Sequence, residues 1–167
     1  MIMRIANLFI TFILLTLLCG YPSVGVAANG AVRINSTAQI QVEVTDKDGK
    51  KILKRTPVEK LIPGTEVIFT TTIQNIIDQP ANDIIISKPV PNDTEYLAGS
   101  AFGSDCEILF SADGGNTFAY ADELTVKGRN GKRRGANPSE YTNIRWYHKV
   151  PLAAGKSAEV GFRAVIK

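Results

Sequence analysis

Hydrophobic and polar residues alternate with a period of two through most of the chain that follows the first 28 residues. In 32–44 the even positions are mostly apolar and the odd positions mostly polar, and similar alternation recurs in 67–74, 143–150 and 159–166. A strand that buries one face has this period, whereas a helix repeats every three or four residues. No segment here keeps a helical period over three turns, so the pattern predicts an all-β protein.

Turn residues separate the alternating segments. Asp46–Gly49 predicts a tight turn, and the basic segment 50–56 predicts an edge strand, because Lys and Arg discourage pairing with a second chain. A short strand is predicted at 83–87, and a hairpin between 106–110 and 117–120. Seven or more short strands joined by turns predict an antiparallel β-sandwich.

The first 28 residues have the features of a secretory signal peptide. Arg4 supplies a positive charge, residues 8–18 form an apolar core, and Val26–Ala28 places small or compact residues before a cleavage site. We place the cleavage after Ala28, which leaves 29–167 as the mature chain. The sequence therefore predicts export by the Sec route to the periplasm or to the extracellular cell surface.

Two other interpretations of this leader are a membrane anchor and a lipid anchor. Its uninterrupted apolar core of about 11–14 residues is shorter than the roughly 20 that a membrane-spanning helix needs. A lipid anchor at Cys19 would normally follow small residues, but the bulky Leu18 precedes it. We therefore expect no transmembrane segment after cleavage.

Composition limits the chemistry of the mature chain. The 167 residues are 44% hydrophobic, which suits one folded domain behind a leader and excludes a multidomain enzyme or a disordered chain. The net charge of +3 does not by itself indicate nucleic-acid binding. The single His and the one Cys left by cleavage offer little material for a metal site or a nucleophile. We expect no catalytic residues, metal or other cofactor, and we expect Cys106 to be buried beside Ile108 and Phe110.

One motif lies in the predicted hairpin and has the aspartate-box spacing of sialidase-like propeller hairpins. Its residues are Ser111, Asp113, Gly115, Thr117 and Phe118. The Ser and Asp side chains can accept hydrogen bonds from backbone N–H groups, the Gly tolerates positive φ, and the Phe can anchor the hairpin. Glycan binding is the alternative, but one box supplies turn chemistry rather than a catalytic constellation. We therefore expect a structural turn.

A glycine-spaced basic segment is the most distinctive predicted surface feature, and we expect it to be a loop. Its cations are Lys127, Arg129, Lys132, Arg133 and Arg134. Such cations suit phosphate or sulfate groups on an envelope polysaccharide, lipid head groups or an acidic protein partner. We expect no nucleic-acid binding, because no aromatic residue is interleaved among these cations to stack bases. The alternative is a solvated loop that serves solubility.

Several segments between residues 58 and 167 carry the pattern of a known family. In chain order they are the Pro-Gly turn and alternating strand at 63–75, the segment 80–86, the turn at 91–96, Gly99-Ser100, Trp146 and the segment 152–162. Together they resemble the conserved repeat domain, also called domain of unknown function eleven, which occurs in secreted, cell-wall and envelope proteins. The resemblance implies an immunoglobulin-like (Ig-like) sandwich. The family has no established activity, so no functional residues follow from it.

The chain departs from this family in two respects. It carries one copy where the family often has tandem copies, which argues against a long adhesive stalk. Ile76–Gln79 replaces the usual Gly-containing turn after Asn75, which predicts apolar residues exposed in a loop.

These observations predict three parts: a signal peptide at 1–28, an N-terminal strand or hairpin extension at 29–57 that packs on the domain, and an Ig-like sandwich at 58–167. We expect an exported, non-enzymatic module of the bacterial envelope with a binding or structural role, whose partner is an envelope polysaccharide or protein. One alternative is a subunit of a secreted or surface assembly paired through a sheet edge. Another is a secreted hydrolase, for which the sequence offers no catalytic constellation.

Overall fold

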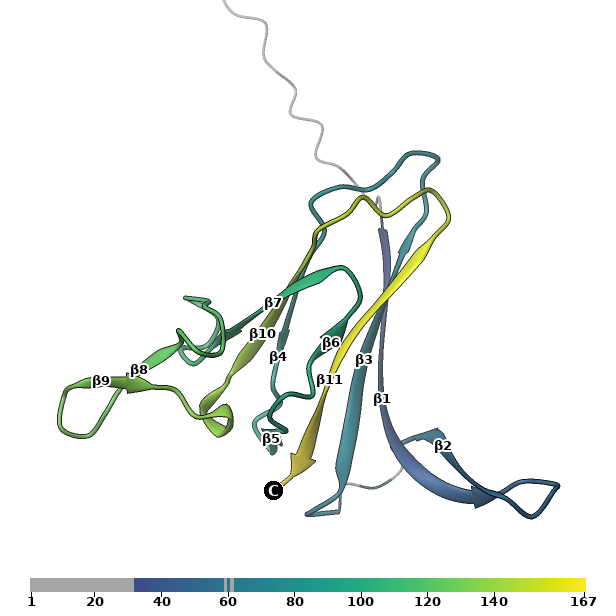
Figure 1. The fold of residues 1–167 in the computed structure, drawn as a ribbon, viewed down its shortest axis with the longest axis horizontal. Coiled ribbons are helices and arrows are strands. Elements are labelled where there is room, and N and C mark those ends of the chain that lie inside the picture. Colours follow the sequence, from purple (N-terminus) through teal and green to yellow (C-terminus); the bar gives the residue numbers. More distant parts are fainter. Residues whose placement is uncertain (1–31, 59, 61) are drawn as a thin grey trace, which may run out of the picture.

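The computed structural model describes residues 32–58, 60 and 62–167 (Figure 1). The predicted signal peptide at 1–28 lies outside the described residues. Within them the chain is all-β, as predicted: eleven strands pair antiparallel, and one short 3-10 turn spans Pro138–Glu140. In the same part of the chain, no helix has the length and apolar character needed to span a bilayer. The strands are β1 (Val32–Thr45), β2 (Lys51–Pro57), β3 (Glu66–Asn75), β4 (Ile85–Pro89), β5 (Thr94–Tyr96), β6 (Phe102–Gly103), β7 (Cys106–Ser111), β8 (Thr125–Lys127), β9 (Arg133–Gly135), β10 (Asn143–His148) and β11 (Ser157–Ile166).

The strands form two main sheets and a separate hairpin. The large sheet has the order β2-β1-β3-β11-β5, with β6 also paired to β11, and the small sheet has the order β4-β10-β7. β8 and β9 pair only with each other among the described strands. Figure 1 shows that the β1–β2 and β8–β9 hairpins project at opposite ends of the molecule. The consecutive strands β10 and β11 lie in different sheets.

The hydrophobic core lies between the two main sheets. Trp146 of β10 is 1% exposed, and its ring lies 6.4 Å from that of Phe162 on β11. Tyr96 of β5 bridges the layers, with its ring 5.6 Å from Phe110 of β7 and 6.2 Å from Phe162. Trp146 Nε1 donates a hydrogen bond to the carbonyl of Phe102, so the buried indole keeps a polar partner. Alternation thus supplies one apolar face from each sheet.

The close packing of β6 on β11 depends on a glycine. A Cβ atom at Gly161 would lie 2.4 Å from the Phe69 carbonyl oxygen and 2.5 Å from Cζ of Phe102. Both distances are too short for non-bonded atoms, so only glycine lets the Phe102 ring lie against this strand.

The β1–β2 hairpin carries apolar residues that the core does not cover. β2 is an edge strand, as predicted from its basic residues, and pairs only with β1. The alternation in 32–44 predicted a half-buried strand, which is wrong at Ile34, because this residue is 53% exposed. Leu53 of β2 is also exposed, at 66%. The reason is that, within the large sheet, β3 and β11 supply buried core residues, whereas β1 and β2 supply none.

Asn75 fixes the loop that follows β3. It is 1% exposed, and its Nδ2 donates hydrogen bonds to the carbonyls of Gln79 at 2.7 Å and Leu152 at 2.8 Å. Its Oδ1 accepts a hydrogen bond from the Ile77 amide at 3.1 Å. Ile76 and Ile77 are both exposed, which confirms that this loop presents apolar residues to solvent.

Candidate functional site

The aspartate-box residues form a turn directly after β7, as predicted. The Ser111 hydroxyl is buried, donates to Asp113 Oδ1 at 2.7 Å and accepts from the Gly115 amide at 2.9 Å. Asp113 Oδ1 also accepts from the amides of Asn116 and Thr117, and Oδ2 accepts from the Thr117 hydroxyl at 2.6 Å. Gly115 has a φ of +88°, which favours glycine. The side chains of Ser111 and Asp113 thus organise most of the turn, and the Thr142 hydroxyl accepts from the Gly114 amide at 2.9 Å.

These hydrogen bonds stabilise the charged form of Asp113. The Thr117 hydroxyl and amide, followed by the Ser111 hydroxyl, lower the pKa of Asp113 from 3.8 to about 2. At neutral pH the group is therefore a carboxylate held inside the turn.

Phe118 anchors the turn in a way that the sequence did not indicate. It is half-buried, and the Arg145 guanidinium from β10 lies 3.6 Å from its ring centroid. The predicted strand at 117–120 does not form, since only an isolated bridge between Phe110 and Ala119 closes this hairpin.

The basic segment was predicted as a loop, and the structure corrects this: it is the β8–β9 hairpin. Gly128 donates a backbone hydrogen bond to the Lys132 carbonyl at 2.8 Å, and Gly131 takes a φ of +78° in the turn between them. The Asn130-Gly131 pair is a common hairpin turn signal, and it could have predicted this element. Three-residue strands are too short to show an alternating pattern of their own.

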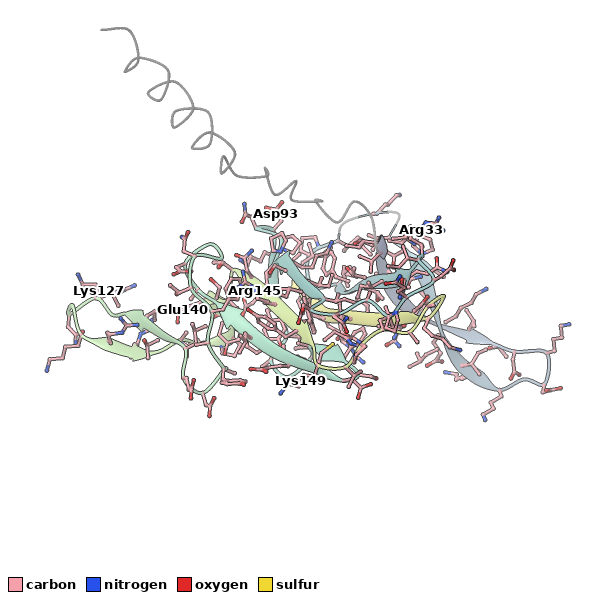
Figure 2. The ribbon with its side chains drawn as sticks, turned by 90° about the horizontal axis from the view of Figure 1, so that it is seen from above. Arg33, Asp93, Lys127, Glu140, Arg145 and Lys149 are labelled. Carbon is pink, nitrogen blue, oxygen red and sulfur yellow. The ribbon has the colours of Figure 1, made fainter. Side chains whose placement is uncertain are left out.

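The hairpin divides the five predicted cations among different positions. Lys127 and Arg133 are register partners, so their side chains leave the same face of the hairpin. Arg129 and Lys132 lie in the turn. Figure 2 shows Lys127 far out on this hairpin, away from the body of the molecule. Arg134 leaves the opposite face, because it pairs with Val126 in the register.

Arg134 is occupied by an ion pair. Its Nη1 and Nη2 donate to the two carboxylate oxygens of Glu140 at 2.7 and 2.6 Å. This fork, with the Asn137 amide, lowers the pKa of Glu140 to about 2. Arg134 therefore braces the base of the hairpin against the 3-10 turn, and we remove it from the candidate anion-binding residues.

A groove of about 500 Å³ brings the aspartate-box turn and the basic hairpin together. Its lining includes Asp113 and Thr117 on one side and Thr125, Lys127 and Arg133 on the other. Sequence reasoning singled out both motifs but gave no sign that they share one groove. It also missed Thr125, whose hydroxyl accepts from Arg133 Nε at 2.9 Å and Nη2 at 2.6 Å.

The remaining candidate chemistry is dispersed. Among the described residues, no three His, Cys, Asp or Glu side chains come close enough to hold a metal ion. Cys106 is half-buried and packs against the core, and burial together with the nearby Asp105 charge raises the pKa of its thiol. The raised pKa disfavours the reactive thiolate.

A second groove, of about 280 Å³, opens between the sheets beside β1 and β4. Its lining is mainly apolar and includes Phe69, Trp146 and Phe162. Lys88 of β4 reaches across to the Ser36 hydroxyl of β1, with its Nζ donating at 2.8 Å. A lysine at a strand edge discourages the addition of another strand. We therefore regard the groove beside the basic hairpin as the stronger candidate site.

In comparisons with known proteins, no family model matches the chain and no curated protein matches it.

Proposed function

We propose that this protein is an exported, non-enzymatic Ig-like module of the bacterial envelope that binds an anionic envelope polymer through the β8–β9 hairpin. One observation carries the proposal. Within the described residues, four exposed cations of the hairpin form no ion pair with a carboxylate. They are Lys127, Arg129, Lys132 and Arg133.

The arrangement of the sheets supports an Ig-like module related to the conserved repeat domain. This comparison counts β1, from the segment predicted as an N-terminal extension, as the first strand of the domain. If β1, β3, β4, β5, β7, β10 and β11 are labelled A to G, the sheets have the orders A-B-G-D and C-F-E. An immunoglobulin constant-type domain has A-B-E-D and C-F-G. The division into four and three strands is the same, with strands E and G exchanged. We therefore propose an Ig-like architecture with a variant connection.

The state of Asp113 supports a binding role over a hydrolytic one. A general acid needs a carboxyl group that holds its proton near the working pH. Asp113 has a pKa of about 2, and its oxygens accept four hydrogen bonds within the turn. The one carboxylate in the lining of this groove therefore serves the turn.

Electrostatic attraction to exposed cations should depend strongly on salt. The Debye length falls to about 3 Å at 1 M salt, so surface attraction is largely screened there. The hairpin also lacks aromatic residues on which bases could stack, which favours a polysaccharide or acidic protein over nucleic acid.

The test compares two variants of equal charge. In the hairpin variant, the four unpaired cations Lys127, Arg129, Lys132 and Arg133 are changed to Ser. In the control variant, four lysines near the opposite hairpin are changed to Ser: Lys47, Lys50, Lys54 and Lys60. Exposed ion pairs contribute about 0.2–1 kcal/mol each. We therefore expect the hairpin variant to bind anionic envelope polysaccharide at least about fourfold more weakly, while the control binds nearly as the wild type does.

Co-sedimentation with the purified polysaccharide at low and high salt gives the measurement, and thermal unfolding confirms that both variants fold. Equal losses in the two variants would indicate non-specific attraction to net charge. Binding by the hairpin variant at wild-type strength, or wild-type binding that does not respond to salt, would refute the role of the hairpin.

A further inference from the structure

Lys127 and Arg133 are directly opposite each other on the two strands of the hairpin. Like charges in this position destabilise a strand pair. Both residues also line the groove beside the aspartate-box turn. An anion held between them would remove the repulsion, so this wall of the groove is suited to a negatively charged group.

Arg133 is held in place by a neighbour. Its Nε and Nη2 donate to the Thr125 hydroxyl oxygen, which leaves Nη1 available to a ligand. The Thr125 hydroxyl hydrogen is also available, because its oxygen serves as the acceptor in both contacts. Together with the ammonium of Lys127, these side chains offer several hydrogen-bond donors on this wall. A group with several acceptor oxygens, such as a phosphate or sulfate, matches it.

The other wall has the opposite character. The Thr117 hydroxyl gives its hydrogen to Asp113 Oδ2, so toward any further group this hydroxyl can act only as an acceptor, and Thr117 lines the groove. Asp113 carries a negative charge at neutral pH, which would repel a second anion near this wall. Sugar hydroxyl groups are suitable donors for these acceptor oxygens.

We infer that this groove is a subsite for a phosphate or sulfate ester carried on a sugar. The ester oxygens lie between Lys127 and Arg133, and the sugar hydroxyls face Thr117 and Asp113. The volume of about 500 Å³ lies within the range of small-molecule binding sites. This inference rests on the proposed function and specifies which chemical group of the polymer is recognised.

Two double variants on the same hairpin test the inference. Lys127→Gln with Arg133→Gln removes the cations of the groove, and Arg129→Gln with Lys132→Gln removes the same charge from the turn. The probe is dextran sulfate, titrated calorimetrically, with uncharged dextran as the control ligand. Loss of charge-assisted hydrogen bonds predicts affinity about 10- to 100-fold lower for the groove variant. The turn variant should lose only about twofold to fivefold, as expected for exposed charges.

The outcomes separate this inference from the proposed function. Equal losses in the two variants would overturn the subsite and leave the hairpin as a general anion-binding surface. Unchanged affinity in both variants would overturn both. Thr125→Val supplies a test at constant charge, because it removes the hydroxyl that orients Arg133 and offers its own hydrogen to the ligand, but it removes no cation. We expect it to weaken dextran sulfate binding about tenfold with an unchanged melting temperature, and wild-type affinity would count against the built site.

The sugar-facing wall is tested with small probes. Glucose 6-phosphate should shift the backbone amide resonances of Asn116 and Thr117 more than an equal concentration of inorganic phosphate does. Equal shifts with the two probes would overturn recognition of the sugar, since they would indicate an anion site alone.

Discussion

The buried side chain of Asn75 provides a sharp test of how the strands and loops of this protein are held together. Asn75→Ala removes two hydrogen bonds donated to the Gln79 and Leu152 carbonyls and one accepted from the Ile77 amide. Each such bond contributes about 0.5–1.5 kcal/mol net, so we expect the free energy of unfolding to fall by about 2–4 kcal/mol. That loss corresponds to a melting temperature lower by about 10 °C.

The assay is urea unfolding followed by the fluorescence of Trp146. This residue is the single tryptophan of the chain and is 1% exposed, so its emission reports the loss of the core. Asn82→Ala is the matched control, because Asn82 lies exposed in the same loop and its side chain makes no hydrogen bond among the described residues. If both variants unfolded at the same urea concentration, the hydrogen bonds of Asn75 would not be what secures the loop.

Two further changes probe the packing of β11 and the aspartate-box turn. Gly161→Ala would force a Cβ atom against the Phe69 carbonyl and should lower the free energy of unfolding by about 1–3 kcal/mol. The control is Gly135→Ala, which should leave that free energy nearly unchanged because the space around Gly135 is open. Equal melting temperatures for the two variants would refute the packing argument. Because Asp113 has a pKa of about 2 in the folded protein against 3.8 ordinarily, its stabilising contribution is present above about pH 4 and is lost as the pH falls toward 2. In a thermal melting series from pH 6 to pH 2, Asp113→Asn should therefore show a flatter acid decline than the wild type, and parallel curves would contradict the assigned role.

Local sequence predicted those features that depend on neighbours along the chain. The alternation in 67–74 and 159–166 predicted β3 and β11. A strand that buries one face alternates apolar and polar residues, and this pattern does not depend on which strand pairs with it. The aspartate-box turn was equally predictable, since most of its hydrogen bonds join residues within 111–117, although the Gly114 amide donates to the distant Thr142 hydroxyl. Most of these hydrogen bonds therefore join residues that belong to one short sequence motif.

The candidate site was predictable only in part. The basic residues were visible in the sequence, but Arg134 is engaged by Glu140 while Lys127 and Arg133 face a groove. This division depends on which face of the β8–β9 hairpin each side chain leaves, and a one-residue change of register would reverse it. Spacing along the chain does not determine that register when the strands are three residues long.

The amino-acid order alone was sufficient for the all-β class, the turns and the identity of the cationic residues, because each follows from short-range patterns of burial, backbone conformation and charge. Only the folded chain decided the sheet order, the exposure of Ile34 and the meeting of the aspartate-box turn with the basic hairpin. These features depend on contacts between segments far apart in the chain. The free energy of such contacts depends on the whole packed arrangement, and no single segment contains that information.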